Sequence, residues 1–198
     1  MNRLRLMAAA AIALVAAACE KPADPAAAGP PPTVVAPPDT VASALPALPA
    51  LPDPVIGPDF VDAVAGANLF EIAEGNLALQ RSSNAKVKDY ASAMIAAHTK
   101  LTASLQAAID ASGQTLEAPT DMSDDLQTKL AALKSTAAAG FDKAYIADQI
   151  AAHQSAVRAM HTYAKRGDAA GFKTFAADTA PIVEEHLARA QALQASLP

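Results

Sequence analysis

Prolines divide this chain into two parts that cannot fold in the same way. Twelve of the 15 prolines lie between residues 20 and 58. Proline fixes φ and removes a backbone donor, so this stretch cannot form helices or strand ladders. We therefore predict a disordered, extended linker over residues 19–58. Only three prolines follow in residues 59–198, which leaves that part free to form long helices in a single domain.

The first 18 residues have the features of an export signal. Arg3 and Arg5 give a positive start, and the apolar run over residues 6–17 is too short to span a bilayer. Cys19, the chain's only cysteine, follows three alanines. Small residues before a lone cysteine resemble the cleavage box of bacterial lipoproteins, although a leucine is usual three residues before the cysteine and this chain has alanine there. We predict a lipoprotein-type signal over residues 1–18 and lipidation of Cys19, with ordinary signal cleavage nearby as the alternative.

A lipid anchor would fix where the protein resides. Glu20 follows Cys19, whereas an aspartate at that position is typical of retention in the inner membrane. We therefore expect a periplasm-facing lipoprotein of the bacterial cell envelope, held in the outer membrane by its lipid. The linker would then be either a stalk for the folded domain or a spacer without a partner. The sequence does not identify a protein partner.

The charge of the folded part argues against a nucleic-acid partner. Residues 59–198 contain 12 Lys and Arg against 16 Asp and Glu, a net charge of −4, with the two signs interspersed. Proteins that bind nucleic acid displace counterions with a basic stripe or patch. No such stripe is present, so we expect no nucleic-acid binding.

Apolar residues beyond Pro58 recur at intervals of three and four, which predicts helices throughout. We expect long helices over residues 59–81, 84–111, 141–165 and 169–195, and a short helix with Leu126, Leu130 and Leu133 that ends near Gly140. Asp59 would cap the first helix, Gly113 would end the second, and Pro181 would bend the last helix or open a new segment. The predicted fold is all-α: an antiparallel four-helix bundle with one extra short helix.

Several polar residues stand on the apolar stripes of these helices. The segment YASAMIAAH, which ends at His98, recurs in outline as YIADQIAAH, which ends at His153. His186 lies in a comparable stretch of the last helix, and Glu71 lies on the stripe of the first. His161 lies off its stripe and is expected on the surface. The residues placed to support the buried set are Tyr90, Met94, Tyr145 and Gln149.

Three segments resemble a known family. They are FEIAEGNLALQRSSNAKVKDYASAMIAAHTKL, which starts at Phe70, and the later FDKAYIADQIAAHQSAV and APIVEEHLARA. All three resemble the domain-of-unknown-function 4142 proteins, and the resemblance spans residues 59–193. It implies a ferritin-like bundle and an envelope location, and little about a reaction. The positions that match the family's recurring polar residues are Glu71, His98, His153 and His186.

These four residues could form a metal site if their heights in the bundle agree. Bundles build such sites from side chains on facing helices, and neutral imidazole suits zinc, copper, iron or nickel. A di-iron site would need Glu-x-x-His pairs, but Ile95, Ile150 and Val183 stand three residues before the histidines. The alternative is that the histidines belong to a buried hydrogen-bond network that only fixes the register of the helices. Both interpretations stay open.

The sequence gives no direct support for catalysis. It has no CxxCH haem motif, no Gly-x-Ser-x-Gly turn and no phosphate-binding glycine loop. We therefore expect a protein that binds a metal ion or small ligand rather than an enzyme. The other classes we weigh are a structural or protein-interaction bundle and a redox enzyme with a histidine-bound metal.

Overall fold

The computed structural model describes residues 55–197, and within this range it contains five helices and no strand. The helices are α1 (Gly57–Arg81), α2 (Ala85–Ser112), α3 (Asp124–Ser135), α4 (Ala138–Arg166) and α5 (Ala170–Ser196). The predicted all-helical fold is thereby confirmed as a helical bundle. The predicted signal, Cys19 and residues 19–54 of the predicted linker lie outside the described residues. No helix of the described range is long and apolar enough to cross a membrane.

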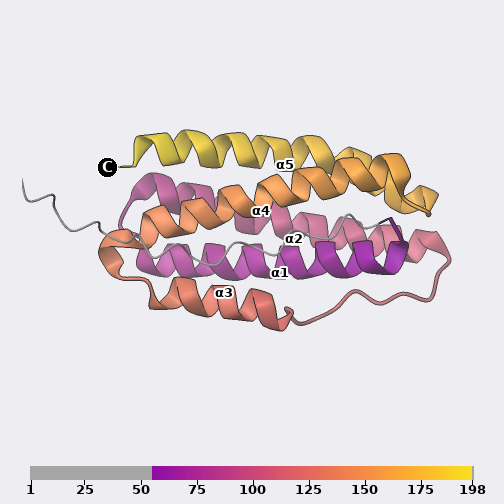
Figure 1. The fold of residues 1–198 in the computed structure, drawn as a ribbon, viewed down its shortest axis with the longest axis horizontal. Helices are drawn as coiled ribbons and strands as arrows, with labels where there is room; N and C mark the ends of the chain where they lie inside the picture. The colour runs from indigo at the N-terminus through magenta and orange to yellow at the C-terminus, as the bar shows by residue number, and fades with distance from the viewer. Residues whose placement is uncertain (1–54, 198) are drawn as a thin grey trace, which may run out of the picture. The chain divides into compact units, whose positions relative to one another are not determined.

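The long helices α1, α2, α4 and α5 lie side by side, and the short α3 lies along α1 (Figure 1). Helix α1 packs against α2, and α4 packs against α5, while α2 also contacts α5. Helix α3 contacts α1 and α4. The site described below is therefore surrounded by the four long helices.

Helix α1 does not begin as predicted. It starts at Gly57 rather than Asp59, with Ile56 at the N-cap position and no side-chain cap. Pro58 lies in the first turn, where its missing N–H is no loss because that amide has no partner inside the helix. Asp59 contributes negative charge near the helix N-terminus instead of capping it.

The boundaries of α2 agree with the sequence prediction. The side chain of Asn84 accepts a hydrogen bond from the backbone N–H of Lys86 at 3.0 Å and so caps the helix. Gly113 ends the helix in a left-handed conformation with φ of 66°. Glycine adopts this conformation without the steric cost that a Cβ would add.

Helix α3 ends at Ser135, five residues before the predicted end near Gly140, which already belongs to α4. The cause is a contact that helical periodicity cannot show. The guanidinium of Arg81 donates hydrogen bonds to the carbonyl oxygens at this end of α3, those of Leu133, Lys134 and Thr136. These bonds satisfy carbonyls that lack partners within the helix.

Helix α5 continues through Pro181, so this proline does not open a new segment. Its side chain is exposed. The backbone hydrogen bond that proline cannot make therefore lies on the solvent side of the helix, where water can satisfy the free carbonyl.

The apolar core consists of two clusters, one toward each end of the bundle. The first cluster includes Phe60, Ile109, Tyr163 and Phe172, and the rings of Phe60 and Tyr163 stack at 4.0 Å. The second cluster consists of the buried residues Ala78, Val87, Tyr90, Ala91, Met94, Leu133, Phe141, Tyr145, Ile146, Ala190 and Leu193. Most of the buried polar residues, including the three histidines, lie between these two clusters along the helices, so the middle of the bundle is polar.

The close contact between α1 and α2 yields a stability prediction. A Cβ on Gly75 would come within 2.7 Å of Cγ1 of Ile95, which is too close unless the Ile95 side chain or a helix moves, whereas a Cβ on Gly66 would meet Leu126 at an ordinary 3.5 Å. We expect Gly75→Ala to lower the free energy of unfolding by about 1–3 kcal/mol through overpacking. Gly66→Ala should raise it by up to about 1 kcal/mol through helix propensity.

Urea denaturation of both variants measures these two changes. Each substitution adds the same methyl group to the same helix, so each serves as the control for the other. A stabilising Gly75→Ala substitution would contradict the close approach of α1 and α2.

Candidate metal centre

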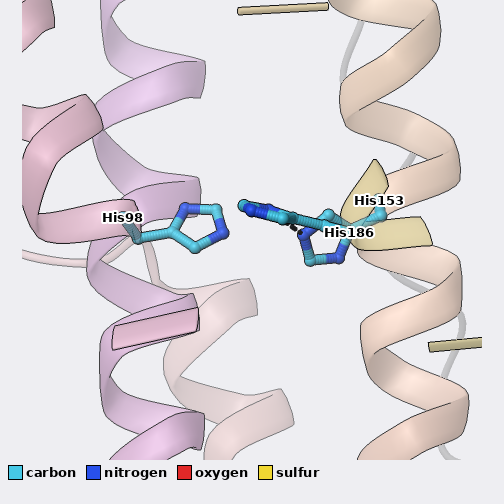
Figure 2. Close-up of side chains that lie close together, drawn as sticks. All are labelled: His98, His153 and His186. Carbon is cyan, nitrogen blue, oxygen red and sulfur yellow. Dashed lines mark hydrogen bonds between the residues drawn. The ribbon is translucent and has the colours of Figure 1, made fainter. Parts of the chain in front are cut away.

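Three histidines from three helices meet in the middle of the bundle. His98 belongs to α2, His153 to α4 and His186 to α5. Each offers one ring nitrogen, and these three atoms lie within 4.8 Å of one another. None of the three residues is more than 5% exposed. Figure 2 shows the rings gathered between their helices.

Helical periodicity explains this convergence. On α4, Tyr145, Gln149 and His153 are spaced by four residues, so they share the buried face. On α2, Met94 and His98 are related in the same way. Along the buried face of each helix, apolar side chains therefore lie toward one end of the bundle, and the histidine lies at its polar middle.

The His153 ring is oriented by its own helix. Its Nδ1 lies 2.8 Å from the carbonyl oxygen of Gln149, which only accepts hydrogen bonds, so Nδ1 is the donor and the lone pair of a neutral ring is on Nε2. This Nε2 lies 3.3 Å from Nδ1 of His186. Two nitrogens bound at about 2.05 Å to one tetrahedral zinc ion are also separated by roughly 3.3 Å. The pair is thus spaced either for a hydrogen bond or for a shared ion.

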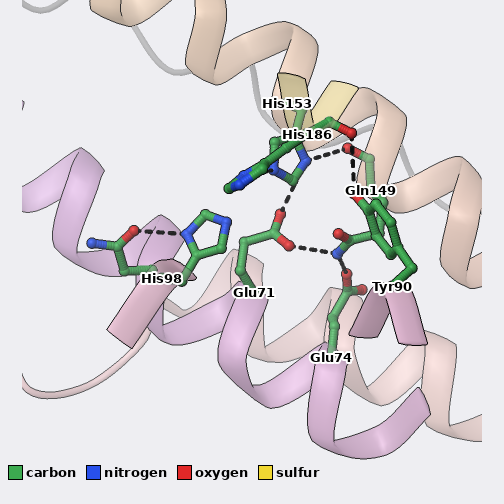
Figure 3. A network of polar contacts seen from close by, with 8 residues as sticks. Glu71, Glu74, Tyr90, His98, Gln149, His153 and His186 are labelled. Carbon is green, nitrogen blue, oxygen red and sulfur yellow. Dashed lines mark hydrogen bonds and ion pairs between the residues drawn. The ribbon is translucent and has the colours of Figure 1, made fainter. Parts of the chain in front are cut away.

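The His98 ring is held in the same manner by a side chain. Its Nδ1 lies 2.9 Å from Oδ1 of Asn68, and with this oxygen as acceptor Nδ1 is the donor (Figure 3). Its Nε2 faces the other two imidazoles and is buried without a hydrogen-bond partner among the described residues. A buried polar atom without a partner costs about 1–3 kcal/mol. A bound ion would supply the missing partner.

Burial keeps the imidazoles of His98 and His186 neutral. Desolvation, and then the neighbouring His153 and His186, lower the pKa of His98 to about 3. Desolvation, His153 and Arg189 lower the pKa of His186 to about 4. Neutral imidazole is the form that binds metal ions. These rings are therefore ready to act as ligands at neutral pH.

Glu71, the fourth predicted ligand, lies beside the three histidines and is not part of their cluster. Its Oε1 lies 4.0 Å from Nδ1 of His153, the nitrogen that faces away from the other two rings. Its Oε2 accepts a hydrogen bond of 2.5 Å from Nε2 of Gln149. Burial raises the pKa of this carboxyl group, and the nearby His153 opposes the shift. Glu71 thus lies outside the cluster of three imidazole nitrogens, where it is hydrogen-bonded to Gln149 and close to His153.

The structure adds polar partners that the sequence prediction missed. Nε2 of Gln149 also donates to Oε2 of Glu74 at 3.0 Å, and burial followed by the charge of Glu71 raises the pKa of Glu74 well above its usual value. Nζ of Lys129 and Oδ1 of Asp148 form a buried ion pair at 2.9 Å. Asn68, Glu71 and Glu74 follow one another at three-residue spacing on the otherwise apolar buried face of α1, and that spacing is the signal which could have revealed Asn68 and Glu74.

The predicted supporting residues fall into two groups. Gln149 is the centre of the hydrogen bonds described above, and the hydroxyl of Tyr90 donates to the backbone oxygen of His186 at 3.5 Å. Tyr145 and Met94 lie in the second apolar cluster, and the hydroxyl of Tyr145 has no partner among the described residues. His161 is on the surface as predicted, with Nε2 at 2.6 Å from Oε1 of Glu184.

The neutrality of the buried imidazoles can be observed directly. In metal-free protein we expect His98 and His186 to remain neutral when the pH falls from about 7 to about 5, although a free histidine titrates near 6.5. Burial disfavours their charged form, and ring nitrogen-15 shifts report protonation. His98 should show a protonated Nδ1 and an unprotonated Nε2. Titration of either ring near its ordinary pKa would contradict the buried geometry.

A match to a protein family covers most of the chain. No curated protein and no solved structure matches it. A family model described as Domain of unknown function (DUF4142) matches residues 44–193, a range that includes all three buried histidines. The chain therefore belongs to the DUF4142 family.

Proposed function

We propose that this protein binds one transition metal ion through His98, His153 and His186. The observation that carries the proposal is the convergence of three buried imidazole nitrogens within 4.8 Å. In two of the rings, those of His98 and His153, Nδ1 contacts a carbonyl oxygen, which leaves Nε2 available toward the centre of the cluster. Histidine ligands of metal ions typically donate their other ring N–H to such an acceptor. The imidazole set suits copper, zinc or iron.

Each residue has a defined part in this proposal. Nε2 of His98, Nε2 of His153 and Nδ1 of His186 are the donor atoms, while Asn68 and the Gln149 carbonyl hold the rings. Three protein ligands leave a fourth position open to water or a small ligand, where a bound ion would act as a Lewis acid. The charge of Glu71 compensates part of the ion's charge from outside the ligand set.

The arrangement of the helices that we infer is an antiparallel four-helix bundle of ferritin-like type. Support comes from the residues that meet in the first apolar cluster. Phe60 near the start of α1 packs with Ile109 near the end of α2, and Tyr163 near the end of α4 packs with Phe172 near the start of α5. Because the site has three histidines and no Glu-x-x-His pair, the proposal is a single-ion site rather than a di-iron oxidase.

The cellular setting is also a proposal. The signal over residues 1–18, the lone Cys19 and the proline-rich stretch after it support a lipoprotein of the bacterial envelope whose folded domain faces the periplasm. Glu20 supports placement in the outer membrane. A binding protein in this position would hold or carry its metal ion without a reaction of its own.

A second candidate is a structural or protein-interaction bundle whose histidines only stabilise the core. It is favoured by the 3.3 Å contact between His153 and His186, which can be a direct hydrogen bond. Such a network would fix the register of α4 against α5. The two candidates differ in whether the metal-free protein takes up an ion.

Elemental analysis of the purified full-length chain distinguishes them. Cys19→Ser is used throughout, so that the only thiol cannot bind the metal. After loading with copper, zinc or iron and gel filtration, we expect close to one ion per chain. The triple variant His98→Ala/His153→Ala/His186→Ala should fold, by circular dichroism, and retain none. His161→Ala, at the exposed histidine, is the matched control and should retain the ion.

A substitution of Asn68, the residue that supports the His98 ring, tests the same proposal through metal affinity. Asn68→Ala should weaken metal affinity by about 10–100-fold, because loss of an outer partner frees the His98 ring. Asn76→Ala is its control, since Asn76 is exposed and bonds only to its own helix. Absence of metal from the parent chain under all loading conditions would contradict the proposal and favour the structural network.

A further inference from the structure

A second feature of the bundle is a pocket of about 530 Å³ that the three histidines do not line. It lies where α1 meets α4 and the beginning of α3. Its walls are largely apolar, with Phe70, Met122 and Leu126 as the largest side chains. Pockets of this size that combine apolar walls with a few polar groups are typical of small-molecule sites.

The charged residues that line this pocket are all acidic. Asp59, Asp62 and Asp121 are exposed, and Glu71 is buried, with 2% of its surface accessible. No Lys, Arg or His is among the described residues that line it. The N-terminus of α3 would favour an anion, but its first turn already carries Asp124 and Asp125. The charge of the pocket therefore selects a cation.

Glu71 has an oxygen that is free for such a ligand. Its Oε2 is taken by Gln149, while its Oε1 lies 4.0 Å from Nδ1 of His153. That nitrogen donates to the Gln149 carbonyl instead, so it does not hydrogen-bond to Oε1. Burial disfavours the charged form of this carboxyl group, and the nearby His153 and Lys129 offset only part of that cost. A cation in the pocket beside Oε1 would stabilise the charged form.

We propose that this pocket binds a small organic cation, with its ammonium group toward Glu71 and its apolar body against Phe70, Met122 and Leu126. The ligand class is an amine with a short alkyl or aromatic body. The apolar walls favour it over an inorganic cation, and the exposed carboxylates of Asp59, Asp62 and Asp121 attract it electrostatically. The pocket is distinct from the cluster of three histidines, because none of its lining residues is a histidine, although Glu71 borders both.

Calorimetric titration of the metal-free full-length chain with octylammonium tests the inference. Octanoate, which has a similar alkyl body and the opposite charge, is the matched ligand control. We expect octylammonium to bind with a stoichiometry of one and octanoate to bind at least about tenfold more weakly. Equal binding of both ligands, or no binding of octylammonium, would overturn the proposal. Because the protein is metal-free, the result does not depend on the histidine site.

Three variants locate the binding. Ala67→Phe fills the pocket from α1 and should abolish binding. Glu71→Gln should weaken binding, because it removes the buried charge while the new side chain can still accept the hydrogen bond from Gln149. Asp62→Asn should weaken binding by about twofold to fivefold, whereas its control Asp89→Asn, on α2 outside the pocket, should leave it unchanged. Binding that survives Ala67→Phe in a folded protein would place the ligand elsewhere and overturn the proposal.

Discussion

The polar middle of the bundle depends on Gln149, which joins the buried carboxylates to the histidines. Its amide nitrogen donates to Glu71 and Glu74, and its backbone oxygen accepts from His153. Buried polar groups are costly unless each finds a partner, so these bonds make it feasible to keep charges and imidazoles in the core. They also orient the His153 ring so that its free nitrogen meets His186.

The two apolar clusters and the polar middle serve different purposes. The clusters hold the ends of the helices together through packed rings such as Phe60 and Tyr163, and so fix the heights of the side chains between them. Glu71 borders both proposed sites, because it lines the pocket and approaches His153 within 4.0 Å. In these two proposals, a single buried carboxylate would contribute charge to a metal centre on one side and to an organic cation site on the other.

The periodicity of apolar residues correctly predicted those features that depend on a single helix. The α2 boundaries at Asn84 and Gly113 and the inward faces of the three histidines follow from local chemistry and three- to four-residue spacing. Features that depend on contacts between helices were missed. Arg81 determines where α3 ends, and Asn68 supports His98. Both act through hydrogen bonds between residues that are far apart in the sequence, by as much as 55 positions. The common height of the histidines could not be predicted, because it is set by packing between helices.

The most direct test of the metal centre is anomalous X-ray diffraction from crystals of the zinc-loaded protein, recorded on both sides of the zinc edge. The account predicts one strong peak at about 2.0–2.2 Å from ring nitrogens of His98, His153 and His186, with Glu71 outside bonding distance. Zinc bound only at surface groups such as His161 and Glu184, with the three buried rings hydrogen-bonded to each other, would contradict it.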